Sequence, residues 1–186
     1  MAGLFKIKDI SVIESLLNVI MEEPGQLIEL SGLAKELKIS RQTLSKYIVY
    51  LEESFLIKKL YNYSGSRRKT ERKLKKYYPA VISPDLLFRE DELSKSHVFE
   101  CLVVNQLNAE FFWRDPYKNE VDIVTTNGEP VPIEVKYGKM DFKGLLAFMK
   151  RFNVNAGYVI SRDNEETRKI NGRVISVVPA SKFFLL

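Results

Sequence analysis

The sequence predicts an α/β protein made of two domains, and three observations support this. The first is charge: residues 1–82 carry 15 Lys and Arg against 9 Asp and Glu, whereas residues 83–186 carry 14 against 15. The second is hydrophobic periodicity, which is helical in the first part and alternates between strand-like and helical runs in the second. The third is a pair of prolines, Pro79 and Pro84, that interrupts the pattern between the parts. We therefore expect domains at 1–82 and 83–186.

The composition excludes several classes of protein. One His and one Cys in the whole chain cannot form a structural zinc site or an internal disulfide. The sequence has no apolar run long enough to cross a membrane, and its N-terminus lacks the apolar core of a signal peptide. We therefore expect a cytoplasmic protein without a membrane partner. The net charge of +5 favours an anionic partner.

Three helices are predicted in the first domain. Apolar residues recur at helical spacing over residues 9–22 and 31–37. A third helix is predicted over residues 41–53, because Ser40 is a suitable N-cap and an apolar stripe follows it. This stripe consists of Leu44, Tyr47, Ile48 and Leu51. Two helices joined by a tight turn, as predicted for the second and third, are typical of a helix-turn-helix.

The outward face of the third predicted helix is polar and cationic. It carries Arg41, Gln42, Ser45 and Lys46. A helix-turn-helix presents such side chains to the major groove of DNA, so we predict that these residues contact nucleic acid. The alternative is a domain that docks a protein or another part of its own chain.

A cationic β-hairpin is predicted after the helices. Residues 57–63 and 73–82 are β-prone, and Ser64–Lys69 forms the tip between them. Residues 55–78 hold nine Lys and Arg against one Glu, and the tip ends in Arg67, Arg68 and Lys69. The hairpin completes a winged helix-turn-helix whose wing contacts phosphates. The adjacent tyrosines either stack on bases or pack the wing onto its domain; they are Tyr61, Tyr63, Tyr77 and Tyr78.

Carboxylates and a lysine mark a candidate site in the second domain. Glu100 lies on or beside the buried stripe of a helix predicted over residues 94–109, where a carboxylate needs a cation, a metal or water as partner. Asp122 lies in one predicted strand, and Glu134 and Lys136 alternate with apolar residues in the next. Carboxylates of this kind hold Mg²⁺ or Mn²⁺, the metal activates water, and a lysine stabilises charge in phosphodiester hydrolysis. The alternative is a surface ion pair.

The pairing of these two strands decides whether the site can form. A two-residue turn at Asn127 and Gly128 pairs residues whose numbers sum to 255, which places Asp122 and Glu134 on opposite faces. An even sum such as 256 places Asp122 opposite Glu134 and brings the apolar residues of both strands to a common face. We therefore predict a three-residue loop or a β-bulge between Asn127 and Ile133.

These residues resemble the PD-(D/E)XK nuclease superfamily, including archaeal proteins similar to Holliday-junction resolvases. The layout of the whole chain resembles the C-terminal region of archaeal and bacterial AAA-type ATPases of unknown function, in which a winged helix precedes a resolvase-like domain. The matching segments are Ser40–Leu51, Trp113-Arg114 with Glu120–Asp122, Ile133–Lys136, and Val178-Pro179 with Phe183–Leu186. The chain lacks a Gly-x-x-x-x-Gly-Lys-Ser/Thr phosphate loop, so it contains no ATPase motif.

Two functions follow from the residues and the resemblance. The first is a DNA-binding protein with a Mg²⁺-dependent, endonuclease-like domain, in which Glu100, Asp122 and Glu134 bind the metal and Lys136 assists catalysis. The second is a non-catalytic module that binds DNA or protein and regulates an ATPase or transcription. The expected partners are DNA and an ATPase module or partner protein. The sequence leaves open a homodimer, and also whether the chain is a fragment of a longer ATPase or stands alone.

Overall fold

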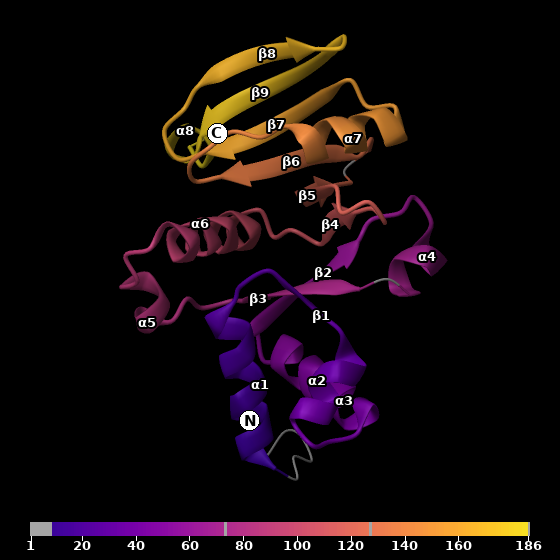
Figure 1. The fold of residues 1–186 in the computed structure, drawn as a ribbon, viewed down its shortest axis with the longest axis vertical. Coiled ribbons are helices and arrows are strands. Elements are labelled where there is room, and N and C mark those ends of the chain that lie inside the picture. Colours follow the sequence, from indigo (N-terminus) through magenta and orange to yellow (C-terminus); the bar gives the residue numbers. More distant parts are fainter. Residues whose placement is uncertain (1–8, 73, 127, 186) are drawn as a thin grey trace. The chain divides into compact units, whose positions relative to one another are not determined.

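The computed structural model describes residues 9–72, 74–126 and 128–185, which form two compact units (Figure 1). Unit 1 comprises Met1–Lys59 and Leu74–Cys101, and unit 2 comprises Leu60–Lys73 and Leu102–Leu186. Two of the three divisions fall within β2 (Ile57–Asn62) and α6 (Glu92–Gln106), and the third lies between Lys73 and Leu74. The predicted boundary after residue 82 differs from this division and stays a prediction. The chain is a mixed α/β protein, and no helix among the described residues is long and apolar enough to cross a membrane.

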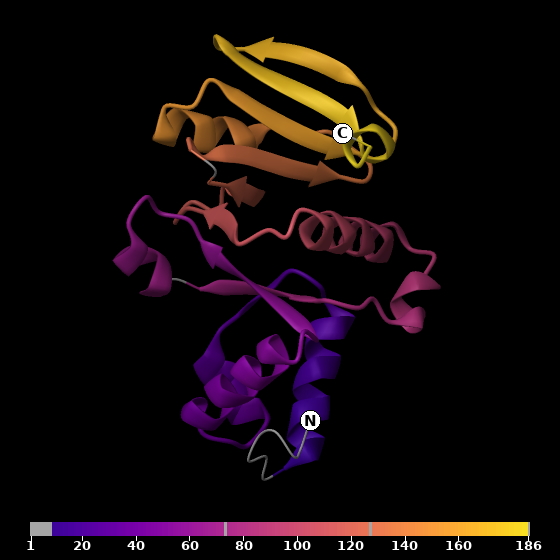
Figure 2. The same cartoon turned by 180° about the vertical axis from the view of Figure 1, so that it is seen from behind.

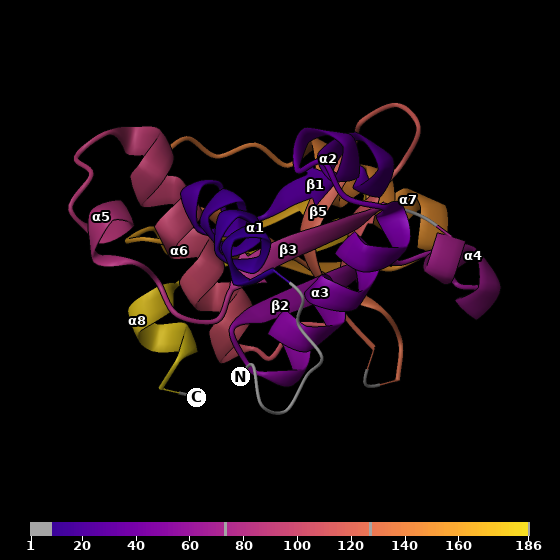
Figure 3. The same cartoon turned by 90° about the horizontal axis from the view of Figure 1, so that it is seen from below.

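Unit 1 contains the three predicted helices. They are α1 (Ile10–Glu22), α2 (Leu30–Glu36) and α3 (Arg41–Glu53), and Figures 1 and 3 show them on the same side of two paired strands. The strands are β1 (Gln26–Ile28), which was not predicted, and β3 (Lys75–Pro79), and they pair antiparallel with Gln26 opposite Tyr77. The short α5 (Pro84–Leu87) precedes α6.

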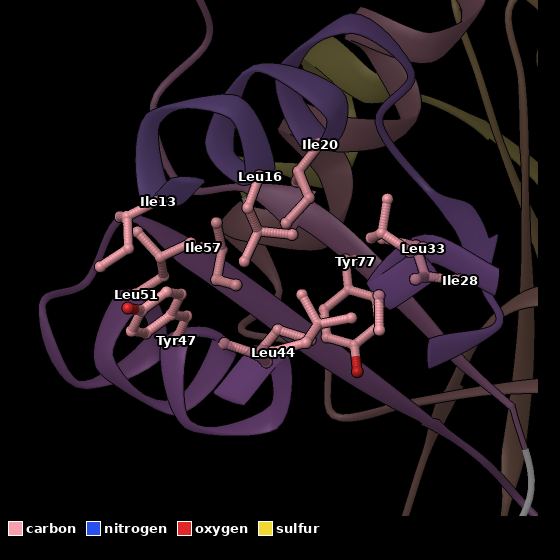
Figure 4. Packing of buried hydrophobic residues seen from close by; sticks show 12 residues of the cluster. Ile13, Leu16, Ile20, Ile28, Leu33, Leu44, Tyr47, Leu51, Ile57 and Tyr77 are labelled. Atoms are coloured by element: carbon pink, nitrogen blue, oxygen red, sulfur yellow. The ribbon is translucent and has the colours of Figure 1, made fainter. Parts of the chain in front are cut away.

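The core of unit 1 joins its helices and strands. The apolar stripe predicted for α3 is confirmed, because all four of its residues are buried. Figure 4 shows this stripe facing side chains of α1 and of the strands. The ten residues labelled there are Ile13, Leu16, Ile20, Ile28, Leu33, Leu44, Tyr47, Leu51, Ile57 and Tyr77.

Local hydrogen bonds and one turn set the helix ends in unit 1. The Ser40 hydroxyl accepts a bond from the Thr43 amide at 3.0 Å, which confirms the predicted N-cap of α3. The α1 helix ends before Gly25, whose φ is +82°. A Cβ atom at Gly25 would lie 2.8 Å from the Tyr78 ring, so only glycine fits this turn.

The predicted hairpin tip is wrong in one respect. Strands β2 and β3 are present, but α4 (Arg67–Arg72) occupies the second half of the segment predicted as a simple tip over Ser64–Lys69. The Ser66 carbonyl accepts bonds from the amides of Lys69 and Thr70, both at 3.0 Å, which begins the helical turn. Arginine, lysine and glutamate are good helix formers, so this charged run favours a helix over an open loop.

Unit 2 is a mixed sheet with helices beside it (Figure 2). The end of β2 pairs in parallel with β4, and the order continues β5, β6, β7, β9, β8. The β6–β7 and β7–β9 pairs are also parallel, whereas the β4–β5, β5–β6 and β8–β9 pairs are antiparallel. The strands after β2 are β4 (Phe111–Arg114), β5 (Glu120–Thr125), β6 (Val131–Lys136), β7 (Ala156–Ser161), β8 (Glu166–Ile170) and β9 (Arg173–Pro179), and the helices after α6 are α7 (Lys143–Phe152) and α8 (Ala180–Phe183).

The predicted even register between β5 and β6 is confirmed. Ile123 lies opposite Ile133 and Thr125 lies opposite Val131, so the paired numbers sum to 256. The connection is longer than the predicted three residues, because residues 126–130 separate the last paired positions. Asn127, which belongs to the predicted turn, lies outside the described residues.

The α7 helix packs on one face of the sheet through buried side chains. Leu145, Phe148 and Met149 of this helix join a cluster with Trp113 of β4, so that tryptophan is part of the packed core. The start of α7 approaches β5 so closely that a Cβ atom at Gly144 would lie 1.8 Å from the Glu120 carbonyl oxygen. Because the obstacle is main chain, a side chain at position 144 must push the helix off the sheet.

We expect Gly144→Ala to lower the free energy of unfolding of unit 2 by about 1–3 kcal/mol or more, as overpacking a closed core does. Gly138→Ala is the matched control, because a Cβ atom at Gly138 meets nothing within 4 Å. Urea unfolding followed by Trp113 fluorescence measures both variants. Equal stability of the two variants would contradict the close approach of α7 to β5.

Candidate functional sites

The outward face of α3 has the exposure that the sequence predicts. Arg41, Gln42 and Lys46 are exposed and Ser45 is half-buried, whereas the opposite stripe of the helix is in the core. The cationic residues lie in the first half of α3, and Glu52 and Glu53 end it. The exposed polar surface therefore coincides with the helix start, where a recognition helix contacts bases.

Glu29 fixes the start of α2, the helix before α3. Its carboxylate accepts bonds from the amides of Ser31 at 3.0 Å and Gly32 at 2.5 Å. The bond from the Ser31 amide, followed by that from Gly32, lowers the pKa of Glu29 below its usual 4.5, and the charge of Arg41 lowers it further. The charged form of Glu29 therefore stabilises the helix pair that positions Arg41.

The predicted cationic wing is only partly exposed. Arg68 and Lys69 are exposed on α4, whereas the side chain of Arg67 lies outside the described part of the chain. Lys59 pairs with Glu52 at 2.6 Å, so this cation serves an internal ion pair. Tyr77 and Tyr78 are 2% and 0% exposed, which confirms packing rather than base stacking for these two tyrosines.

Glu100 finds its partners within unit 1. Its Oε1 accepts a bond from the Tyr78 hydroxyl at 2.6 Å and lies 3.3 Å from Nζ of Lys76, a buried lysine. This answers the requirement that a carboxylate beside a buried stripe be paired. The negative charge of Glu100 also balances the positive charge of Lys76, which would be costly to bury without a counter-charge.

Asp122 uses its carboxylate to complete the pairing of β5 with β6. The aspartate is 8% exposed, and its Oδ2 accepts a bond of 2.8 Å from the Val135 amide. The paired positions of the two strands end at Ile123 and Ile133. Beyond this point, the Val135 amide bonds to the side chain of Asp122 in place of a main-chain carbonyl. Asp122 therefore has a structural task at the predicted site.

Glu134 and Lys136 form the ion pair expected for residues on one face of a strand. Lys136 Nζ lies 2.7 Å from Glu134 Oε1, and the side chains are 24% and 9% exposed. In the neighbouring strand β7, Val159 is opposite Glu134 and Ser161 is opposite Lys136. The structure thus brings Glu134 together with Lys136, as predicted, at the carboxyl end of β6.

The three predicted metal ligands come from both units, and their binding of a metal stays a prediction. Among residues 9–72, 74–126 and 128–185, no three His, Cys, Asp or Glu side chains gather closely enough to hold an ion. Glu100 belongs to unit 1, whereas Asp122 and Glu134 belong to unit 2. Each of the three carboxylates accepts hydrogen bonds from protein groups. As arranged, these residues hold the fold, and we derive no step through a metal.

One contact near Lys136 has no counterpart in the sequence analysis. The guanidinium of Arg162, just beyond β7, lies 5.0 Å from the centre of the Tyr137 ring, just beyond β6. A hydrogen bond to Asp163, followed by one to Tyr137, raises the pKa of Arg162. In the sequence, Tyr137 directly follows the predicted strand that carries Glu134 and Lys136. Its pairing with Arg162 depends on the parallel register of β6 and β7.

Comparison with protein families gives two matches. Residues 1–80 match a domain of unknown function, DUF8612, and residues 95–183 match a second domain of unknown function, DUF4143. The DUF4143 domain is known in contexts associated with AAA-type ATPases. No curated protein and no solved structure matches the chain.

We expect Glu29→Gln to lower the stability of unit 1 at neutral pH and to flatten its acid dependence. A carboxyl whose pKa is lowered in the folded state stabilises it above the ordinary value of 4.5, and this contribution is lost as the pH falls. Urea unfolding followed by circular dichroism between about pH 3 and 7 measures the difference. Glu36→Gln, at an exposed glutamate of the same helix, is the control. An unchanged acid dependence in Glu29→Gln would contradict this role.

We expect Asp122→Ala to lower the free energy of unfolding by about 1–3 kcal/mol, because it leaves the buried Val135 amide without its acceptor. Asp122→Asn should lose less, since its amide oxygen accepts the same bond. Chemical unfolding of both variants, and hydrogen exchange at Val135, measure the effect. Faster exchange at Val135 in the alanine variant alone is the expected result, and equal exchange in all three proteins would contradict it.

Proposed function

We propose that this chain is a DNA-binding module whose unit 1 is a winged helix and whose unit 2 is a non-catalytic PD-(D/E)XK-like domain. The exposed start of α3 carries the proposal. There Arg41, Gln42 and Lys46 project from a helix whose other face is locked in the core. A helix held in this way offers guanidinium and amide groups to base edges without first having to become ordered.

The electrostatics of the exposed cations supports contact with a polyanion. Arg68 and Lys69 add exposed positive charges on α4, whereas Lys59 and Lys76 are held in ion pairs with glutamates. Exposed cations gain from releasing the counterions of DNA, and those in internal pairs gain less. In this proposal α3 reads bases, and Arg68 and Lys69 bind phosphates.

The hydrogen bonds of the carboxylates support a non-catalytic unit 2. Asp122 holds the Val135 amide, Glu134 holds Lys136, and Glu100 binds Tyr78 and Lys76. A Mg²⁺ ion would have to compete with these internal bonds for its ligands. The proposal therefore gives the three acidic residues a structural role and places the function in binding.

The match of residues 95–183 to DUF4143 supports an ATPase as the working partner. The layout of a winged helix followed by a resolvase-like domain, which resembles the C-terminal region of AAA-type ATPases, points the same way. We propose that the module brings such an ATPase to DNA.

We expect Arg41→Ala/Lys46→Ala to weaken binding to duplex DNA by about 1–3 kcal/mol for each lost base contact and to reduce the preference among DNA sequences. Arg68→Ala/Lys69→Ala should instead weaken binding to all sequences about equally and reduce the slope of log affinity against log salt by about 2, one for each lost phosphate contact. Fluorescence anisotropy over a salt series measures both variants. Lys150→Ala, at an exposed cation of α7, is the control.

Two outcomes would contradict the proposal. Unchanged affinity and slope in both double variants would exclude DNA contact by α3 and α4. Cleavage of branched or duplex DNA with Mg²⁺ or Mn²⁺, retained in Lys150→Ala and lost in Glu134→Gln, would show instead that unit 2 is a nuclease. Binding without cleavage is the result we expect.

A further inference from the structure

Strand β8 forms an exposed edge of the unit 2 sheet. Figure 1 shows it as the outermost strand, and among the described strands it pairs with β9 alone. Three of its five residues, Thr167, Arg168 and Lys169, are exposed. An edge of this kind offers main-chain donors and acceptors to another strand.

The hairpin between β8 and β9 determines which groups point outward. Ile170 lies opposite Arg173, and Asn171 and Gly172 have φ of 52° and 78°, which fits a two-residue type I′ turn. In such a hairpin the residues that flank the turn exchange hydrogen bonds, and alternate residues follow the same pattern. Residues 166, 168 and 170 therefore bond to β9, whereas the amides and carbonyls of 165, 167 and 169 face the open edge.

The charges along this edge are antisymmetric about Thr167. Two glutamates precede this threonine and two cations follow it, in the order Glu165, Glu166, Thr167, Arg168 and Lys169. When this segment is read backwards, each negative charge is replaced by a positive charge and each positive charge by a negative one. A second copy that runs antiparallel to the first presents its residues in this reversed order, so that opposite charges face each other.

We propose that two copies of this chain pair through β8, antiparallel about a two-fold axis at Thr167, and so extend the sheet from one copy into the other. In this register Thr167 lies opposite itself, Glu166 lies opposite Arg168, and Glu165 lies opposite Lys169. The main-chain amides and carbonyls of residues 165, 167 and 169 then bond to those of the second copy. These are the residues whose main-chain groups point away from β9 in the β8–β9 hairpin. Opposite charges directly across a strand pair stabilise it.

The neighbouring symmetric registers bring like charges together. A two-fold axis at Arg168 places arginine against arginine, and an axis at Glu166 places glutamate against glutamate. Like charges directly opposite each other destabilise a strand pair. The charges therefore select the register centred on Thr167 over its neighbours.

The pairing also makes use of contacts present in the single chain. Arg168 already lies 2.8 Å from Glu166 on its own strand and 5.3 Å from the centre of the Phe142 ring. These contacts hold the guanidinium on the face of β8 where the second copy's Glu166 would arrive. The proposal is independent of DNA binding and of the chemistry of unit 2.

Charge variants of the full chain test the proposal. Glu165→Lys/Glu166→Arg makes the edge wholly positive, and Arg168→Glu/Lys169→Glu makes it wholly negative. We expect each variant alone to sediment as a monomer, and an equal mixture to recover twice the 21.5 kDa mass of one chain. The unchanged protein should form the same dimer, weakened by salt. Circular dichroism confirms that both variants are folded.

Cysteine variants test the register directly. Thr167→Cys should form a disulfide between copies under mild oxidation, because hydrogen-bonded opposite residues have Cα atoms about 5.5 Å apart, within the range for disulfides. Lys169→Cys is the control, since its two copies would lie about 14 Å apart. Cys101 is buried and remains in both variants.

The proposal is overturned if the unchanged protein is a monomer at all concentrations, if either charge variant still forms dimers, or if the mixture does not restore them. Efficient cross-linking through Lys169→Cys, or none through Thr167→Cys, overturns the register.

Discussion

Every side chain in the middle of β5 and β6 is buried, so the register between these strands decides which residues meet. Val121–Val124 and Pro132–Val135 have no solvated face to which a misplaced residue can turn. The even register pairs Ile123 with Ile133 and leaves the Asp122 carboxylate beside the Val135 amide. A shift of one residue would bury charges against the apolar cluster beneath α7. The contact between the Asp122 carboxylate and the Val135 amide follows from that pairing.

The same requirement explains why the acidic residues are engaged. A buried polar group needs a partner within reach, and each acidic residue here has one in its own unit. Asp122 serves a main-chain amide, Glu134 serves a lysine, and Glu100 serves both a lysine and a tyrosine. In the proposed function, the motif that resembles a catalytic centre is therefore retained for packing. At the start of α3, the polar residues Arg41, Gln42 and Lys46 remain accessible to solvent.

Local signals were sufficient to predict the three helices α1, α2 and α3 of unit 1. Ser40 and the stripe that begins at Leu44 set the start and the buried face of α3, because capping and periodicity depend on neighbours along the chain. The β5–β6 register was also predictable, since the apolar alternation and the length of the turn constrained each other. These cases share one property: the residues that decide the structure are close in sequence.

Other elements depend on contacts that are distant in sequence. The start of α7 is set by the Glu120 carbonyl, which leaves no room for a side chain at Gly144, and no local pattern indicates this. Strand β1 is only three residues long and forms because β3 lies beside it. The α4 helix was missed for a different reason, because the prediction used the positive charge of Arg67, Arg68 and Lys69 and not the helix propensity of these residues. The partners of Glu100 could not be predicted, since Tyr78 and Lys76 reach it from another element.

The edge of β8 shows how charge can serve two opposite purposes. Charged residues usually protect an edge strand, because they make pairing with an arbitrary strand unfavourable. That protection requires only that charges be present, in any order. The order at Glu165–Lys169 is antisymmetric, so the charges that repel most strands are complementary to one strand, namely the same segment reversed. A strand of uniform charge would be protected from every copy of itself, whereas this strand excludes its shifted registers and favours one. Selectivity for a single partner is thus compatible with protection against all others, and it arises here from sequence order rather than from composition.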